Sequence, residues 1–350
     1  ETDCVVGVLG WESIKFALGP DASADVIPFG DLEKHKILGA GTFGKVWLVS
    51  QKGTKDAYAL KVQNKRQLIE YGQAEGVTRE KNIMARLDHP FIIKLVSSYK
   101  DENNVYMLMK LYQGGELQSV IHTDKRNGLP ERAAKFYAAG VLEGLGYMHR
   151  LHVLYRDLKP ENVLLDSDGY TVIVDLGFAT VVPDKTYTFC GTPLYIAPEV
   201  VLQQGYDKSY DHWSWGVMLY EMIVGVTPFY DGKIDQMTLY KNICRAKYEF
   251  PPGGFMSSSS KDLIRRVLVP NPKERLGSFA AGDVDIRRHS WFDGIDWEKL
   301  AKKELRVPWT PKVKDPLDGN NFGNWEHLEK ESEKKGKPLS KKEQEIFDKF

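Results

Sequence analysis

The spacing of apolar residues changes once along this chain, and the change constrains its fold class. In residues 31–109 the apolar residues form short alternating runs typical of β-strands, interrupted by one helical pattern near residues 77–87. After Gly114-Gly115 they recur at intervals of three and four, which is typical of helices. The strand-like runs are 46–49, 58–60, 92–95 and 105–108, and the main helical stripes are 134–148, 213–224 and 263–268. The sequence therefore predicts an α+β protein: a small, mainly antiparallel β unit up to about residue 109, then a larger, mostly α-helical unit from about residue 114.

The net charge and the cysteine content exclude several classes of protein. The 350 residues contain 48 Lys and Arg against 48 Asp and Glu, so there is no overall attraction to nucleic acid or anionic lipid. No apolar stretch approaches the roughly 18 residues that a membrane span needs. The three cysteines, Cys4, Cys190 and Cys244, are too few and too widely spaced for a disulfide framework or a zinc site. We therefore expect a cytoplasmic protein with no nucleic-acid partner and no membrane span.

The two ends of the chain differ in composition from its middle. From residue 293 the sequence is polar, charged and interrupted by prolines, which predicts a tail (293–350) that lies over the surface without a core of its own. Residues 1–30 form a lead-in, and because the chain begins with Glu1 we expect it to be part of a longer protein. Residues 31–292 then form the main domain.

A glycine-rich stretch at residues 39–44 fits the pattern G-x-G-x-x-G. In a dinucleotide-binding fold this loop opens a helix, but here a strand-like run follows directly, so the loop is expected at the tip of a hairpin. Glycines at 39, 41 and 44 would let backbone amides approach phosphate groups, and Phe43 at the tip could shield them from water. An ordinary glycine-rich turn explains the pattern equally well.

An ion pair is predicted from the spacing of residues around Val77. Glu80 falls on the apolar stripe of that helical segment, where an unpaired carboxylate would cost several kcal/mol. Lys61, at the end of an apolar strand, is the candidate partner, and a lysine fixed in this way can hold phosphate oxygens. The alternative is a slightly rotated helix that leaves Glu80 at the surface.

A second hairpin is predicted around an Asp-Gly turn at residues 168–169. Its two apolar strands would place Asn162 and Asp175 side by side at the open end. A small number of oxygen ligands suits Mg²⁺, which keeps several waters and shares substrate phosphates. The preceding segment, 155–162, is densely polar although it connects an apolar helix to an apolar strand. Solvation alone could explain this polarity, but a functional loop explains it better.

The order of these motifs resembles that of the eukaryotic protein kinases. Along the chain run the glycine loop, Y-A-L-K ending at Lys61, Glu80, Y-R-D-L-K-P-E-N at 155–162, D-L-G at 175–177 and A-P-E at 197–199. Tyr155, together with T-F-C-G-T-P at 188–193 and E-R-L-G at 274–277, further resembles the cyclic-nucleotide-dependent branch. The resemblance implies a bilobal kinase fold, with one main helix in the β lobe, and phosphorylation of Ser or Thr at the expense of ATP.

The same resemblance implies roles for individual residues. Asp157 would accept the proton of the substrate hydroxyl, Lys159 would neutralise charge on the transferred phosphoryl group, and Thr192 would hold both. Asn162 and Asp175 would bind Mg²⁺. The nucleotide would be bound by Leu38, Gly39, Gly41, Phe43, Gly44, Val46, Ala59, Lys61, Glu80, Met109, Tyr112, Glu116, Leu164 and Phe322.

Substrate recognition and regulation are implied in the same way. Glu116, Glu161 and Glu221 match acids that receive arginines upstream of the phosphorylated residue, so substrates would carry Arg or Lys before Ser or Thr. An internal pair between Glu221 and Arg265 is the alternative for that carboxylate. Thr188 matches the activating phosphosite, near Arg156. The motifs also depart from the usual pattern at Lys110, Leu176 and Leu194, which we expect to affect selectivity more than catalysis, and Glu199 and Arg275 match the ion pair that closes the lower lobe.

The chain ends refine the resemblance. Residues 5–20 resemble the exit helix of a cyclic-nucleotide-binding domain, as in cGMP-dependent protein kinases, although an arbitrary amphipathic lead-in would look similar. Phe347 and Phe350 resemble the hydrophobic motif with which this branch docks its tail on the small lobe. We therefore expect a cGMP-regulated kinase with a regulatory region upstream in the same chain. The alternatives are a cAMP-dependent catalytic subunit and, from another class, a pseudokinase scaffold.

Overall fold

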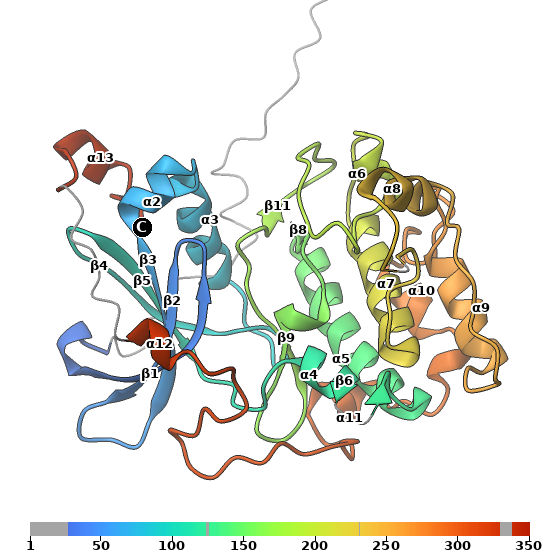
Figure 1. The fold of residues 1–350 in the computed structure, drawn as a ribbon, viewed down its shortest axis with the longest axis horizontal. Coiled ribbons are helices and arrows are strands. Elements are labelled where there is room, and N and C mark those ends of the chain that lie inside the picture. The colour runs from blue at the N-terminus through green and yellow to red at the C-terminus, as the bar shows by residue number, and fades with distance from the viewer. Residues whose placement is uncertain (1–26, 124–125, 231, 330–337) are drawn as a thin grey trace, which may run out of the picture.

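The computed structural model describes residues 27–123, 126–230, 232–329 and 338–350. Figure 1 shows two units, one built on a twisted sheet and one mostly of helices, with the tail running along both. The expected exit helix at 5–20 lies outside the described residues.

The small unit is a five-stranded antiparallel sheet, as the alternating apolar pattern predicts. Its strand order is β1-β2-β3-β5-β4. The strands are β1 (Leu32–Gly41), β2 (Gly44–Gln51), β3 (Ala57–Asn64), β4 (Leu95–Lys100) and β5 (Asn104–Lys110), and the helices are η1 (Phe29–Asp31), α2 (Lys65–Glu70) and α3 (Ala74–Met84). The strand predicted at 92–95 is wrong: β4 begins at Leu95, because Ile92 and Ile93 pair instead with Ile173 of the other unit.

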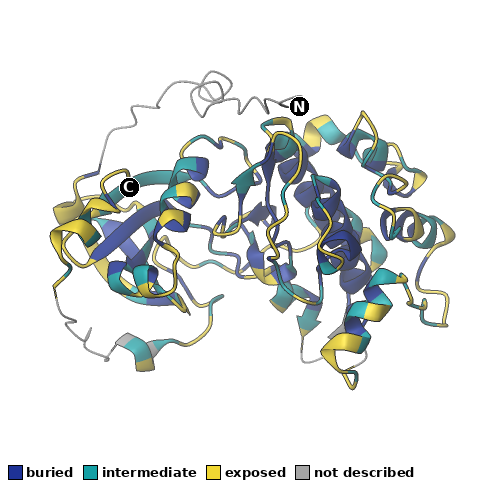
Figure 2. Cartoon of the chain, turned by 90° about the horizontal axis from the view of Figure 1, so that it is seen from above, coloured by how far each residue is buried: buried dark blue, intermediate teal, exposed yellow. Residues whose placement is uncertain are grey.

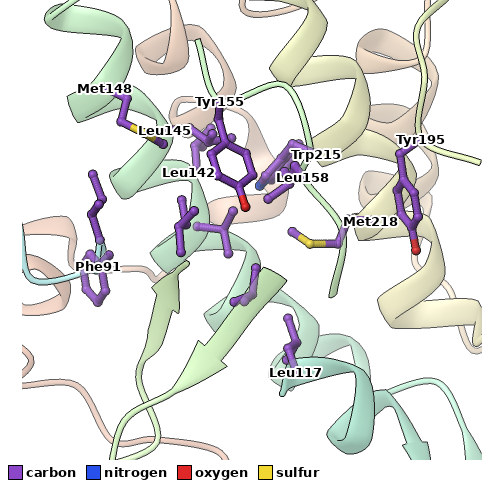
Figure 3. Packing of buried hydrophobic residues seen from close by; sticks show 14 of the residues in the cluster. Phe91, Leu117, Leu142, Leu145, Met148, Tyr155, Leu158, Tyr195, Trp215 and Met218 are labelled. Carbon is purple, nitrogen blue, oxygen red and sulfur yellow. The ribbon is translucent and has the colours of Figure 1, made fainter. Parts of the chain in front are cut away.

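Two long helices form the centre of the larger unit, α5 (Glu131–Arg150) and α7 (Ser209–Val224). In Figure 3, Leu142 and Leu145 of α5 lie beside Tyr155 and Leu158 of the following loop, and all are buried in one core with Trp215 of α7. Figure 2 shows that burial is concentrated in this centre and in the inner strands of the sheet. The polar loop 155–162 is therefore built on the most buried part of the molecule.

Shorter elements surround these two helices. The helices are α4 (Leu117–Ile121), η2 (Pro160–Asn162), α6 (Pro198–Val201), α8 (Gln236–Cys244), α9 (Ser258–Val267), α10 (Asp283–Arg287) and η3 (Ser290–Phe292). The strands form the pairs β6 (His122–Thr123) with β7 (Arg126–Asn127), β8 (Val153–Leu154) with β11 (Thr180–Val181), and β9 (Val163–Leu165) with β10 (Thr171–Ile173). Across the described residues, no helix is both long and apolar enough to cross a membrane.

The tail contains α11 (Trp297–Ala301), α12 (Glu326–Glu329) and α13 (Lys341–Glu345). Its end lies on the small unit, where α13 is beside α2 in Figure 1. Phe347 is fully buried, and Lys65 lies over its ring at 5.2 Å. The Nζ atom of Lys100 donates to the carbonyl of Phe347 at 2.6 Å, so backbone and side chain are both held there.

A completely buried ion pair joins α6 to the segment after α9. The guanidinium of Arg275 donates to both carboxylate oxygens of Glu199, at 2.8 and 2.9 Å, and neither side chain is exposed. Arg275 also donates to the carbonyl of Ser209 and lies 5.0 Å from the ring of Trp213. Both charges are therefore satisfied without water, which makes the pair sensitive to loss of either partner.

We predict that Arg275→Ala lowers the free energy of unfolding by about 3–5 kcal/mol, because it leaves the Glu199 carboxylate buried without a cation. Urea unfolding followed by tryptophan fluorescence measures the change. The control is Arg266→Ala, which removes a pair with Asp262 whose side chains are 60% and 46% exposed, and should change the free energy by less than about 0.5 kcal/mol. Equal effects of the two variants would contradict the prediction.

Candidate active site

The glycine loop forms the tip of the β1–β2 hairpin, where Gly41 pairs with Gly44. A side chain at Gly44 would come within 1.7 Å of the carbonyl oxygen of Val62, so only glycine fits there. Gly39 and Gly41 have neither such a contact nor a positive φ, and a Cβ atom on either would meet nothing within 4 Å. Folding therefore does not require glycine at 39 and 41, and the space beside them is open to a ligand that approaches the backbone.

The predicted ion pair between Lys61 and Glu80 is formed. The Nζ atom of Lys61, on β3, lies 2.7 Å from Oε1 of Glu80 on α3, and Glu80 is 3% exposed. Nζ also lies 3.2 Å from Oδ1 of Asp175, a contact that the sequence did not predict. Burial by itself would lower the pKa of Lys61, but the carboxylates of Asp175 and Glu80 outweigh it and raise that pKa. Lys61 is therefore a fixed cation between two acids.

Asp157 is the centre of a hydrogen-bonded group in the loop before η2. Its Oδ1 accepts from the Thr192 hydroxyl at 2.7 Å, and its Oδ2 accepts from the amide nitrogen of Asn162 at 2.9 Å and lies 3.2 Å from Nζ of Lys159. Nζ of Lys159 also donates to the Thr192 hydroxyl at 3.0 Å. The structure thus brings together the three residues predicted to be catalytic and one predicted metal ligand, although Thr192 lies 35 positions from Asp157.

The hairpin of β9 and β10 places Asn162 and Asp175 at its open end. Ile173 pairs with Val163, and the next amide, that of Val174, donates to the carbonyl of Asn162 at 3.0 Å. Since the amide nitrogen of Asn162 faces Asp157, its oxygen is the atom available to a cation. The positive charge of Lys61 lowers the pKa of Asp175, which keeps that side chain ionised.

These two oxygen ligands suit Mg²⁺ better than a metal ion whose ligands are all protein side chains. In the described residues, no group of three or more His, Cys, Asp or Glu side chains could hold a metal ion. Mg²⁺ is commonly bound through one or two protein side chains together with substrate phosphates and waters. The pair would therefore hold Mg²⁺ in the presence of a phosphate ligand, near the open glycine loop.

One residue that positions the loop was missed in the sequence. Asp211 on α7 is completely buried and accepts hydrogen bonds from the backbone amides of Tyr155 and Arg156, at 2.9 and 2.8 Å. His149 of α5 lies 2.7 Å from the same carboxylate. The available signal was an acid in the first turn of an otherwise apolar helix, where a carboxylate must find donors.

The apolar residues predicted to contact the nucleotide all belong to, or pack against, one buried cluster that spans the two units. Their register supports the grouping, because Ala59 pairs with Met109 and Val46 pairs with Lys61. The buried members are Leu38, Ala59, Met109 and Tyr112, and the partly buried residues packed against them are Phe43, Val46, Leu164 and Phe322. The tail supplies Phe322, and the neighbouring Asn321 donates to the carbonyl of Gln113 at 2.8 Å.

The three acids predicted to bind substrate influence one another. Partial burial and the charge of Glu161 raise the pKa of Glu116. Burial also raises the pKa of Glu221, and Glu161 adds to the increase, while hydrogen bonds from Tyr195 and His122 oppose it. The structure therefore places the acids in one region of negative charge.

The internal partner that the sequence offered for Glu221 is wrong. Arg265 lies over the ring of Phe250, 4.9 Å from its centre, because α9 directs it to the aromatic cluster near α8. The carboxylate of Glu221 instead accepts from the hydroxyl of Tyr195 and contacts His122. Neither contact neutralises its charge while His122 is unprotonated.

Thr188 is exposed between the D-L-G and A-P-E motifs. Its carbonyl accepts from the hydroxyl of Tyr206 at 2.7 Å, and that hydroxyl also accepts from Arg156 at 3.3 Å. The hydroxyl of Tyr206 therefore links Arg156 to the backbone of Thr188. Cys190 is buried beside the same hydroxyl, at 3.6 Å, as expected for a small core residue.

Comparisons with known proteins agree with this geometry. The family model described as "Protein kinase domain" matches residues 32–292. The chain is 40% identical over 307 residues to a cAMP-dependent protein kinase catalytic subunit of Arthrobotrys oligospora, covering 87% of this chain and 58% of that protein. It is 42% identical over 283 residues to cAMP-dependent protein kinase type 3 of Saccharomyces cerevisiae, covering 81% and 70%.

A third relative is human cGMP-dependent protein kinase 2, which is 42% identical over 302 residues, covering 85% of this chain and 39% of that protein. The cAMP- and cGMP-dependent relatives are equally similar, so the cGMP-dependent branch favoured by the sequence is not singled out. The chain spans little more than half, or less, of the length of two of these three relatives. It belongs to the protein kinase family and contains a protein serine/threonine kinase domain.

Proposed function

We propose that this chain transfers the γ-phosphate of Mg-ATP to Ser or Thr residues of protein substrates that carry upstream basic residues. The observation that carries the proposal is the group formed by Asp157, Lys159 and Thr192 beside the cation Lys61, all positioned by buried elements. Phosphoryl transfer needs positioning and electrostatic stabilisation more than covalent chemistry, and this group supplies both.

Each part of the group has a task in that reaction. Lys61, held by Glu80, would bind phosphate oxygens, while backbone amides at Gly39 and Gly41 approach the same phosphates. Mg²⁺, held by Asn162 and Asp175, would supply positive charge at those oxygens. Asp157 would orient the substrate hydroxyl and accept its proton, since both of its oxygens are already held in place.

A pseudokinase scaffold is the alternative from another class. It would bind ATP or partners without turnover, and loss of Lys61, Asp157 or Asp175 would favour it. All three residues are present and lie in one site, with Lys61 in contact with Asp175. The geometry therefore favours an active enzyme.

Domain organisation and regulation belong to the same proposal. Residues 31–292 would be the kinase domain, and 293–350 would be a tail that wraps it and ends in a hydrophobic motif. A cyclic-nucleotide-binding region upstream in the same chain would regulate a cytoplasmic enzyme, with cGMP as the nucleotide favoured by the lead-in. Because relatives named for cAMP and for cGMP are equally similar, activation of the full-length protein by each nucleotide would decide between them.

We predict that Lys61→Met lowers phosphoryl transfer at least about 100-fold, because it removes one fixed charge from the phosphate site. Initial rates with a basic peptide and Mg-ATP measure the loss, and circular dichroism shows whether the fold is retained. The matched control is Lys52→Met, at an exposed lysine just after β2 whose Nζ atom donates to the Gly30 carbonyl. Its rate should stay within about twofold of that of the original protein. Near-normal turnover by Lys61→Met would contradict the assigned role.

We predict that Thr188 is phosphorylated in active protein and that Thr188→Ala lowers activity at least about tenfold. A phosphate carries about −1.5 to −2 charge and would attract Arg156, which would order the segment around the site. Mass spectrometry and peptide assays test both statements. Thr186→Ala is the control, since Thr186 is held by backbone hydrogen bonds to Tyr206. Full activity with unmodified Thr188 would refute the prediction.

We predict that replacing the arginine two or three places before the acceptor residue lowers kcat/KM by about 10- to 100-fold, the effect of losing a hydrogen bond between charged groups. Glu116→Ala and Glu221→Gln should reduce this preference. The control is Glu298→Gln, an exposed acid on α11. A peptide library varied singly at these positions measures the preference, and a preference unchanged by Glu116→Ala and Glu221→Gln would show that other residues bind the arginines.

A further inference from the structure

Glu221 is the most enclosed of the three substrate-facing acids. Its side chain is 6% exposed, and the two oxygens of its carboxylate face different partners. One accepts from the hydroxyl of Tyr195, and the other lies 3.4 Å from Nε2 of His122. A carboxylate enclosed between a phenol and an imidazole is paired with a positive charge only when that imidazole is protonated.

His122 has a side chain that is partly exposed to solvent beside Glu221. It follows α4 as the first residue of β6, and its side chain is 29% exposed. Among the described residues, Glu221 on α7 contacts the imidazole directly, Glu161 on η2 acts on Glu221 and on Glu116 before α4, and the phenol of Tyr195 donates to Glu221. In the ladder beside it, β7 contributes Arg126, which pairs with Thr123. The imidazole is therefore open to solvent and lies against the carboxylate of Glu221.

We propose that the protonated imidazole of His122 competes with a substrate arginine for Glu221, so that recognition of basic substrates weakens as the pH falls from about 8 to about 6. The inference rests on the proposed function for the direction of substrate binding, and it adds a residue that determines specificity and its pH dependence.

The sign follows from the charges. When His122 is neutral, it offers Glu221 at most one uncharged hydrogen bond, which an arginine with its charge-assisted pair of donors displaces. When His122 is protonated, the imidazolium and the carboxylate form an ion pair, and a substrate arginine must break that pair or lie beside a second cation. Both effects weaken binding at low pH, and by linkage the bound arginine disfavours the imidazolium form of His122.

The first test measures binding without turnover. A peptide with arginine at both upstream positions and Ala in place of the acceptor residue is titrated into the protein with Mg-ATP, and fluorescence anisotropy gives Kd at several pH values. Because an imidazole commonly gains its proton within this range, Kd should rise roughly four- to tenfold between pH 8 and pH 6. His122→Gln should remove this dependence, and His122→Arg should give the weak binding at both pH values.

The peptide supplies a control within the same protein. The two arginines are replaced by Ala one at a time. One of the two replacements should abolish the pH dependence, namely that of the arginine which Glu221 binds. Glu221→Gln should abolish it as well. Protonation of Glu116, Glu161 or Glu221 itself would also weaken binding at low pH. That pH dependence would persist in His122→Gln, and its persistence would overturn the proposal.

A second measurement tests the pair directly. Histidine-selective NMR of the ¹³C-labelled protein, with the His122 signal assigned from His122→Gln, should show more imidazolium at pH 6.5 in the original protein than in Glu221→Gln, and less after peptide binding. Equal values in the two proteins, or a Kd that does not change with pH, would overturn the inference. Absence of phosphoryl transfer at pH 8 to the same peptide with Ser at the acceptor position would refute the proposed function, which the binding and NMR results do not measure.

Discussion

The carboxylate of Asp211 is the interaction on which the site depends. It is completely buried, yet it accepts from two consecutive backbone amides of the loop before η2 and contacts His149. A single side chain of α7 therefore fixes the loop that carries Asp157 to the helix α5. Arg156 in that loop has a positive φ of 71°, a conformation that a non-glycine residue keeps only when its surroundings determine it.

A second interaction joins the two units across their junction. Lys61 belongs to the sheet and Asp175 follows the β9–β10 hairpin of the helical unit, 114 positions later in the chain. Their ion pair, together with Glu80, sets the distance between the glycine loop and the predicted metal ligands. The site is thus created by the approach of two units, and each unit alone would hold only part of its charges.

The tail contacts the segment that connects the two units and also the small unit. Asn321 is bonded to Gln113 in the segment that connects the units, and Gln113 in turn donates to the carbonyl of Asp318 at 2.8 Å. Further along, Phe347 is buried on the small unit. A polar segment can therefore be held in place without a core of its own, because the two units supply apolar surface and hydrogen-bond partners for it.

The sequence alone predicted those features of the structure that depend on a local motif or on a periodic pattern of apolar residues. The alternation of apolar residues predicted the antiparallel sheet, the Asp-Gly turn predicted the hairpin between Asn162 and Asp175, and the position of Glu80 on an apolar stripe predicted its pairing with Lys61. Only the tertiary structure decided the partners of Asp211 and of Glu221, the start of β4 at Leu95 and the contact of Lys61 with Asp175. The physical reason is that periodicity shows which residues must be buried, whereas the identity of a buried charge's partner depends on which distant segments the packing of the core brings within hydrogen-bonding distance.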